Sequence, residues 1–322
     1  MNHKDKHPRV NPIELNEDAT INEIAEEFKN SGVFGAGRIA KAIEIYSKML
    51  NKKATVFLGI AGALVPGGMK KILTDMIRND MVHVIVTTGA NVTHDIIEAF
   101  GGEHIRQVPY TSDSELREKS IDRIYDAFVA DESFMKLEDK IQPIFQEIYE
   151  KHKDSNDVLA ISTRKLMSLI GEKLEDPDSF VRAAYEKDVP IFVPAFGDCI
   201  LGLQLWLFSQ MKKIYIDDMG DLGEIQRTAW DSDLAGAIFL GGGVPKNYIF
   251  QSRLMSPKTF DYAIQITMDR VETGGLSGAS LEEAISWGKV DQKSHMITVV
   301  SDVTIALPLI YSATLSRLKK SD

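Results

Sequence analysis

The sequence contains only one cysteine, Cys199, among its 322 residues. One cysteine cannot pair within the chain, which excludes a domain held together by disulfides and a zinc site built from several thiolates. The sequence also lacks an apolar run of about 18 residues that could cross a bilayer, and its first residues lack the apolar stretch of a signal peptide. We therefore expect a cytoplasmic protein without a membrane segment.

Basic residues are outnumbered, with 37 Lys and Arg against 47 Asp and Glu, so the formal net charge is −10. This charge argues against broad nucleic-acid binding, because phosphate contacts need a basic surface, and it is compatible with a cationic ligand. The histidines are not arranged as metal ligands. None of His83, His104 and His295 has metal-ligand spacing with another histidine, so we expect no metal site.

Apolar residues make up 44% of the chain, enough for a large core, and short apolar runs alternate with longer amphipathic stretches. The pattern is helical over residues 21–50, apart from a break at residues 31–35. The strand-like runs are almost continuously apolar, which is typical of strands buried on both faces of a parallel sheet. These runs are Thr55–Ile60, Val82–Thr87, Ile191–Pro194, Ile214–Ile216, Ala235–Leu240, Asp261–Thr267 and Met296–Val300. We predict an α/β fold with a doubly wound, mainly parallel sheet and helices on both faces.

Two segments depart from this alternation. Residues 1–20 are polar and contain two prolines, which indicates a polar N-terminal arm. Residues from about 111 to 180 are charged and mostly helical in pattern, which predicts a helical insertion. No linker rich in Pro, Gly or Ser marks a boundary, so we expect residues 21–322 to form a single domain.

Glycines gather where predicted strands end. Four such places are residues 59–68, 87–95, 194–198 and 241–245, the last beginning with three consecutive glycines. Ligands of open α/β sheets bind beyond the carboxyl ends of the strands, where glycine lets the backbone approach a pyrophosphate. The alternative is that these glycines serve only tight turns. Because four of them meet at one predicted edge, we favour a cofactor site.

A fifth glycine cluster matches a nucleotide motif without its context. Residues 35–40, GAGRIA, fit the dinucleotide fingerprint G-x-G-x-x-A. That fingerprint needs a preceding strand to aim its helix at the pyrophosphate, whereas the preceding residues here have a helical pattern. We therefore predict a turn between two helices at this position.

The most informative segment is GLSGASLEEAISWGKV at residues 275–290. Ser280 and Glu283 have capping-box spacing, which predicts a short helix from Ser280, and Gly288 is placed to end it. Lys289 then follows Trp287 closely. A lysine on a defined turn beside a tryptophan is suited to trap a carbonyl or an imine, because burial makes an amine nucleophilic near neutral pH. Lys289 could instead only complement the helix dipole, with Trp287 filling core and Glu283 capping.

This segment resembles the deoxyhypusine synthase family, as do the GGGVPK turn at 241–246 and the SDVT segment at 301–304. The resemblance extends from about residue 35 to the C-terminus. It implies a Rossmann-like NAD-binding fold, a homotetramer with sites at a dimer interface, and NAD-dependent transfer of the 4-aminobutyl group of spermidine through a lysine imine.

The resemblance also assigns roles to residues of this sequence. Lys289 matches the nucleophilic lysine, Trp287 the tryptophan that stacks on the polyamine, and Glu283 a carboxylate of the polyamine site. The positions that match the cofactor site are Thr88, Gly89, Asp198, Gly241, Gly243 and Asp302.

Several positions depart from the eukaryotic members of the family. Two acids of their polyamine pocket correspond to Leu203 and Leu276, which removes attraction for an ammonium group. In the substrate site, Asn247 stands in place of a histidine and Gln251 in place of a second polar side chain. In the cofactor site, His94 replaces a glutamate and Thr273 replaces an aspartate that would meet the NAD ribose.

Three functions therefore stay open. In the first, the acceptor is the lysine of the translation initiation factor 5A precursor, so that the product is deoxyhypusine. In the second, the acceptor is a small amine, putrescine, and the product is homospermidine. The third is a polyamine- and NAD-binding protein without transferase activity; the presence of Lys289 argues against it, since an inactive copy would be free to lose that residue.

Overall fold

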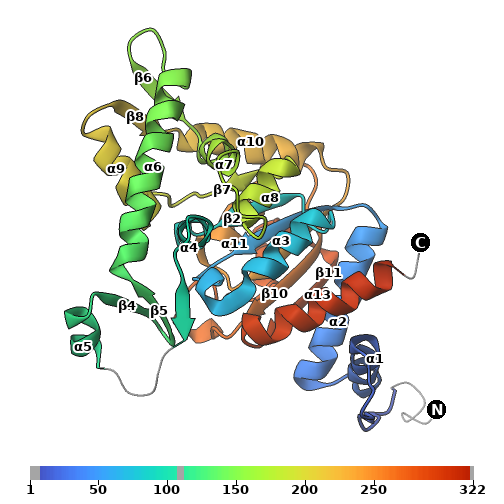
Figure 1. Cartoon of the computed structure of the whole chain (residues 1–322). Coiled ribbons are helices and arrows are strands. Elements are labelled where there is room, and N and C mark those ends of the chain that lie inside the picture. Colours follow the sequence, from blue (N-terminus) through green and yellow to red (C-terminus); the bar gives the residue numbers. More distant parts are fainter. Residues whose placement is uncertain (1–7, 107–111, 320–322) are drawn as a thin grey trace.

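The structure, a computed structural model, describes residues 8–106 and 112–319. At its centre lies a sheet of six parallel strands in the order β11-β10-β9-β1-β2-β7 (Figure 1). Its strands are β1 (Thr55–Ile60), β2 (Val84–Thr87), β7 (Ile191–Phe192), β9 (Ala235–Leu240), β10 (Phe260–Thr267) and β11 (Val290–Val300). From β1 the chain continues outward to β2 and then β7, and from β9 it continues in the opposite direction to β10 and then β11. The crevice between these two strands is where a doubly wound sheet binds its ligands.

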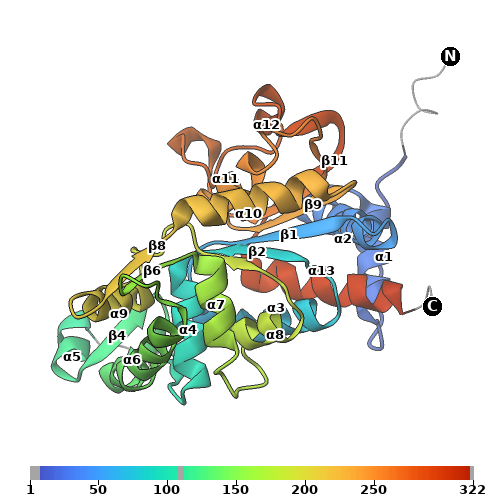
Figure 2. The same cartoon turned by 90° about the horizontal axis from the view of Figure 1, so that it is seen from above.

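Each face of the sheet has its own core. In β1, Val56, Leu58 and Ile60 face one core, whereas Phe57 faces the other. The first core contains α2 (Phe34–Asn51), α3 (Lys70–Arg78) and α13 (Val303–Leu318), and the second contains α10 (Asp218–Asp231), α11 (Gly243–Gln251) and α12 (Glu283–Ser286). Figure 2 shows α10, α11 and α12 on one side of the sheet and α3 and α13 on the other. The predicted doubly wound α/β fold is confirmed.

The N-terminal helices pack against the end of the chain. Helix α1 (Ile21–Ser31) begins with a capping box between Thr20 and Glu23 and contacts α13, where Arg317 pairs with Glu26 at 2.7 Å. The GAGRIA motif lies in the first turns of α2 rather than in a turn, because the turn between α1 and α2 is formed by Gly32 and Val33, just before the motif. A Cβ on Gly37 would lie 2.4 Å from the carbonyl carbon of Gly32, which explains the glycine at position 37 by close approach of α2 to the end of α1.

The segment predicted as a helical insertion is only partly helical. It contains α5 (Asp113–Glu118), α6 (Asp131–His152), α7 (Thr163–Gly171) and the start of α8 (Phe180–Glu186), but also β4 (Ile121–Ile124), β5 (Ala127–Ala130) and β6 (Val158–Ile161). With β3 (His104–Arg106), the first two strands form an antiparallel sheet, and β6 pairs with β8 (Lys213–Ile216). These strands have only three or four residues, too few for a clear alternation. The predicted strand at 214–216 therefore exists, but outside the central sheet.

Other predicted boundaries also moved. Strand β2 begins at Val84 rather than Val82, and β11 begins six residues before Met296. Residues 8–20 contain no helix or strand, while the predicted arm's first seven residues, and the predicted insertion start at 111, lie outside the described residues. Within residues 8–106 and 112–319, no helix is long and apolar enough to cross a membrane.

Candidate active site

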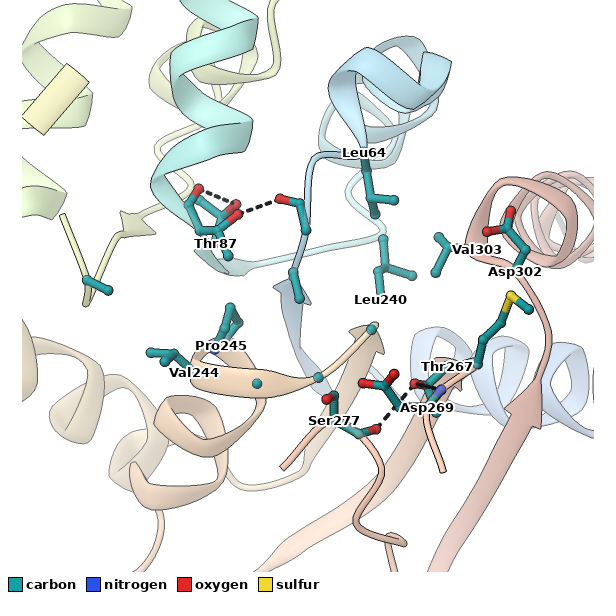
Figure 3. A pocket seen from close by; sticks show the side chains of 18 of the residues that line it. Leu64, Thr87, Leu240, Val244, Pro245, Thr267, Asp269, Ser277, Asp302 and Val303 are labelled. Atoms are coloured by element: carbon teal, nitrogen blue, oxygen red, sulfur yellow. Dashed lines mark hydrogen bonds between the residues drawn. The ribbon is translucent and has the colours of Figure 1, made fainter. Parts of the chain in front are cut away.

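A cavity of about 520 Å³ opens at the carboxyl ends of the parallel strands (Figure 3). It lies at the crevice between β1 and β9 and receives residues from the ends of β1, β2, β9, β10 and β11 and from the segment after β7. We call it the strand-end pocket. Its lining includes Gly62, Thr88, Gly89, Asp198, Gly241, Gly242, Gly243, Asp269, Ser277 and Asp302.

Backbone forms much of the strand-end pocket. Helix α4 (Gly89–Ala99) begins at Gly89, where a Cβ would lie 2.4 Å from Cys199 Sγ. Helix α11 begins at Gly243, and both Gly241 (φ 84°) and Gly243 (φ 59°) have the left-handed conformation that favours glycine. Neither helix N-terminus is capped by a side chain, and two such N-termini fit the phosphates of a nucleotide cofactor.

Side chains hold this edge in place. Thr88 Oγ1 donates to the carbonyl of Gly62 at 2.8 Å, and Asn91 Nδ2 donates to Thr88 Oγ1 at 3.0 Å. Asn91 Oδ1 accepts from the N–H of Leu64 at 2.8 Å. The loop after β1 is thereby fixed to the start of α4, so the pocket is formed before any ligand binds.

A second cavity, of about 320 Å³, lies between α11, α12 and the loop at 274–280. We call it the lysine pocket, because it contains both Lys246 and Lys289. The other residues that line it are Asn247, Phe250, Gln251, Leu254, Leu276, Ala279, Ser280, Glu283, Ala284 and Trp287.

The turn that carries Lys289 has the predicted form. Gly288 ends the short helix with a φ of 68°, and Lys289 follows it, half-buried. The Lys289 ammonium donates to Asn247 Oδ1 at 3.1 Å and lies 5.4 Å from the ring centroid of Trp287. Helix α12 begins at Glu283, three residues later than predicted, although Ser280 Oγ accepts from the N–H of Glu283 at 3.3 Å.

The surroundings of Lys289 favour a reactive amine. Burial lowers its pKa, and the Glu283 carboxylate opposes this effect. A lysine with a lowered pKa has a larger uncharged fraction at neutral pH, and the uncharged amine is the nucleophile. The lysine pocket therefore combines a nucleophile, an aromatic face and one carboxylate.

Comparisons with known proteins identify the family. The deoxyhypusine synthase family model matches residues 23–314. The chain is 45% identical over 302 residues to a probable deoxyhypusine synthase of Methanosarcina thermophila, covering 94% of this chain and 92% of that protein. It is 40% identical over 310 residues to one of Methanothermobacter thermautotrophicus, covering 96% and 98%. The chain belongs to the deoxyhypusine synthase family.

A solved structure supports the fold of this deoxyhypusine synthase family member. The putative deoxyhypusine synthase of Entamoeba histolytica superposes with a TM-score of 0.68 at 21% identity, covering 93% of this chain and 94% of that one. Membership makes the protein a transferase and implies aminobutyl transfer from spermidine.

The structure brings most of the residues predicted from the deoxyhypusine synthase resemblance together. Lys289, Trp287, Glu283, Asn247 and Gln251 all line the lysine pocket. The positions that match the family's cofactor site all line the strand-end pocket: Thr88, Gly89, Asp198, Gly241, Gly243 and Asp302. Asp302 also accepts from the N–H of Thr304 and so caps α13.

His94, one of the two altered positions expected at the cofactor, lies away from the strand-end pocket. It lies inside α4 rather than at a strand end, is only 8% exposed, and does not line the strand-end pocket. Its Nδ1 is 2.9 Å from His104 Nε2, and His104 Nδ1 is 2.7 Å from Glu98 Oε1. Burial, followed by the neighbouring His104, lowers the pKa of His94 to about 4. Residues 87–95 were expected at the end of a strand, but α4 begins at Gly89, so His94 lies in the second turn of that helix.

The other departures from the family pattern are scattered. Leu276 lines the lysine pocket, but Leu203 lies on α9 (Ile200–Ser209), is 47% exposed, and lines neither pocket. Thr273 is exposed and lines neither pocket; its hydroxyl donates to the carbonyl of Arg270. Gln251 lies beside Asn247, whose amide donates to it at 3.3 Å.

The sequence interpretation missed Lys246. Its side chain is only 4% exposed, yet it lines the lysine pocket. Burial lowers its pKa to about 8. The available signal was its position directly after the triple-glycine turn and Pro245, in a segment that the resemblance had already marked.

Proposed function

We propose that this protein is an NAD-dependent aminobutyl transferase that takes the 4-aminobutyl group of spermidine to the lysine of the translation initiation factor 5A precursor. The observation that carries the proposal is the position of Lys289, in a pocket next to a glycine-lined pocket at the strand ends. Segments 241–246 and 276–279 supply residues to both pockets, so a cofactor and the lysine would share one wall.

The strand-end pocket has the features that NAD requires. Gly89, Gly241 and Gly243 would let its pyrophosphate approach the backbone, and Asp198 and Asp302 would be available to its ribose hydroxyls. When bound, NAD supplies hydride chemistry, accepting a hydride from the donor amine and returning it to the product.

The lysine pocket would carry out the transfer. Glu283 would hold an ammonium of spermidine, and Trp287 would cover its methylene chain. The uncharged Lys289 amine would attack the oxidised carbon of the donor and form a C–N bond, while the bond to the departing 1,3-diaminopropane breaks. The acceptor amine would then attack the same carbon of the lysine imine, and Lys289 would leave as a free amine.

Release of 1,3-diaminopropane tests the donor. Purified protein with NAD and spermidine should release it, as measured by chromatography of derivatised amines, and omission of NAD should abolish the release. If no 1,3-diaminopropane forms with any acceptor present, the protein does not cleave spermidine. The third function, binding of polyamine and NAD without transfer, would then replace the proposal.

The acceptor is tested separately. We expect labelled aminobutyl to reach a purified initiation factor 5A precursor when that protein is offered. Offering putrescine instead distinguishes the second function, because transfer to it yields homospermidine. Leu203 and Leu276 give this alternative its support, since they stand where eukaryotic relatives have acids, and acceptor recognition would change with them.

We also propose a homotetramer whose sites are completed at a subunit interface. The face of α9 that carries Leu203 also exposes Trp206 and Leu207, and an apolar helix face of this kind is typical of protein contacts. Light scattering should give the mass of four chains, and Trp206→Glu should reduce it. A monomer at the concentrations used for activity would overturn this part of the proposal.

A further inference from the structure

Asp269 lies two residues beyond the end of β10 and lines the strand-end pocket. Its backbone is fixed in place, because its N–H donates to Thr267 Oγ1 at 3.1 Å and that hydroxyl donates to the carbonyl of Ser277 at 3.2 Å (Figure 3). The buried amide of Gln265 donates to the same carbonyl at 2.9 Å. Within residues 8–106 and 112–319, the Asp269 carboxylate has no hydrogen bond or ion pair. It is therefore held at the edge of the pocket and available to a ligand.

The order of the strands places Asp269 beside the triple-glycine turn. Gly62, Gly89 and residues 241–243 follow β1, β2 and β9, and β10 is the strand next to β9 on the outer side. If these glycines hold a pyrophosphate, as proposed, a ribose attached to it lies over the neighbouring strand end, within reach of Asp269. A carboxylate accepts hydrogen bonds from adjacent ribose hydroxyls, and dinucleotide-binding sheets commonly recognise a ribose in this way.

The surroundings of Asp269 suit the adenosine half of the cofactor. Met268 after β10 and Val303 after β11 also line the pocket, and their apolar side chains can hold an uncharged adenine ring. Asp198 lines the pocket from the segment after β7, at the opposite edge of the sheet from β11. A carboxylate there suits the positively charged ring of oxidised nicotinamide. The adenosine ribose is then the one that Asp269 reaches.

The charges that line the strand-end pocket are all negative. Asp198, Asp269 and Asp302 contribute carboxylates, and in the part of the chain that the structure describes no lysine, arginine or histidine lines the pocket. A phosphate on the 2′-hydroxyl of the ribose would add about two negative charges. Sites for such cofactors commonly place an arginine near that phosphate. Here the phosphate would meet the Asp269 carboxylate instead, and it would also remove one of the hydroxyl donors.

We propose that Asp269 is the specificity-determining residue of the cofactor site: its carboxylate binds the hydroxyls of the adenosine ribose and repels a 2′-phosphate, so that the protein binds NAD in preference to NADP. This inference rests on the proposed use of NAD and adds the residue that selects it. Thr273, where the family resemblance expects an acid at the ribose, lines neither pocket and offers a direct comparison.

Calorimetric titration of the full-length protein with NAD and with NADP, without any amine, tests the assignment. The wild-type protein should bind NAD about 100-fold more tightly than NADP. In Asp269→Asn, NAD affinity should fall about tenfold, because charge-assisted hydrogen bonds are lost, and NADP affinity should rise about fivefold, because the repulsion is lost. Asp269→Arg should go further and favour NADP, since a guanidinium group pairs with a phosphate. Asp269 is exposed, so these variants should fold.

Three comparisons make the result specific to Asp269. Glu272→Gln removes an exposed carboxylate three residues away that lines neither pocket, so it should keep the wild-type ratio of affinities. Thr273→Asp, added to Asp269→Asn, should not restore NAD affinity. ADP-ribose, which lacks nicotinamide, should lose affinity for Asp269→Asn as NAD does, whereas nicotinamide mononucleotide should not.

The outcomes separate this inference from the proposed function. An unchanged ratio of NAD to NADP affinity in Asp269→Asn would overturn the role of Asp269, as would restoration by Thr273→Asp or a loss confined to nicotinamide mononucleotide. The transferase proposal would still stand if NAD and spermidine gave 1,3-diaminopropane. If the ratio shifts as expected but no 1,3-diaminopropane forms, the role of Asp269 stands and the transferase proposal fails. If the wild-type protein binds neither dinucleotide, both fail.

Discussion

The two pockets are built in different ways. The strand-end pocket depends on backbone: glycines that follow parallel strands, two helix N-termini and a loop fixed by Thr88 and Asn91. The lysine pocket depends on side chains, with Lys246, Glu283, Trp287 and Lys289 projecting from two helices and a turn. One wall separates the two pockets. A pocket formed by backbone should keep its function when lining side chains change and lose it when an added atom fills the space. A pocket formed by side chains should lose its function when the chemical groups of those side chains change.

The largest expected effect is on transfer alone. Lys289→Ala should reduce formation of the borohydride-trapped imine by about 1,000-fold or more, because it removes the nucleophile. NAD binding, measured by calorimetry, should stay near the wild-type value, since Lys289 does not line the strand-end pocket. Lys293→Ala, an exposed lysine on β11, is the control. Continued transfer by Lys289→Ala would show that another residue carries the aminobutyl group.

The second largest effect should come from a substitution in the shared wall, which should impair both pockets together. In Gly242→Ala the new Cβ would lie 2.3 Å from Ser277 Cα, so the wall must move. Overpacking of this kind costs about 1–3 kcal/mol of stability, and we expect NAD affinity and transfer to fall together by about 100-fold.

Gly101→Ala is the matched control for this prediction. Its Cβ would meet nothing within 4 Å, only its φ of 85° opposes the substitution, and it lines neither pocket. It should cost about 1 kcal/mol in thermal unfolding and change NAD affinity far less. If Gly242→Ala loses transfer but binds NAD normally, the pockets do not depend on a common wall.

A smaller effect, on binding of the amine donor, should be confined to the lysine pocket. Glu283→Gln should raise KM for the amine donor by about tenfold, because a charge-assisted hydrogen bond becomes a neutral one. The pKa of Lys289 should also fall, because the Glu283 carboxylate raises it. The neighbouring exposed Glu282→Gln is the control, since Glu282 does not line the lysine pocket. A weaker binding of NAD by Glu283→Gln would contradict the division into two pockets.

The smallest effect on ligands should come from His94. We expect His94→Gln to leave NAD affinity unchanged, which would limit the strand-end pocket to the first turn of α4. The stability of the variant should differ instead. The folded-state pKa of His94 is about 4, below the ordinary 6.5, so folding favours its neutral form. This contribution is present above pH 6.5 and is lost as the pH falls towards 4, by up to about 3 kcal/mol.

Urea unfolding at pH 7 and pH 5 measures this difference. His94→Gln should lose less free energy of unfolding between the two pH values than the wild-type protein, and the exposed His152→Gln should behave like the wild type. An equal loss in all three proteins would mean that His94 is not held neutral by the fold, and a loss of NAD affinity would return it to the cofactor site.

The backbone pocket was the easier one to predict. Strands β1 and β9 were located to the residue, because each is a largely apolar run with glycine at or just beyond its end, and the switch point between them fixes the ligand edge. The side-chain pocket came largely from the family resemblance. Nothing in local periodicity reveals that Lys246 meets the carbonyls of Leu276 and Ala279, about 30 residues later in the chain.

The errors have a similar cause. The short strands β4, β5 and β6 depend on pairing with other segments, and their half-exposed residues carry no strong pattern of their own. Residues 87–95 were expected together at a strand end, whereas α4 begins at Gly89 and takes His94 into its second turn. Long buried runs encode their structure locally; short strands and networks of hydrogen bonds do not.

The position of β1 in the sheet has a consequence for how the chain is made. Thr55–Ile60 pairs with Ala235–Leu240, so the centre of the sheet cannot close until about three quarters of the chain has left the ribosome. Pairing across such a separation slows folding, and until then the apolar edge of β1 is open to other chains. The crevice that makes the site possible therefore also makes newly synthesised protein vulnerable to aggregation, and chaperones should matter more for its yield than its final stability suggests.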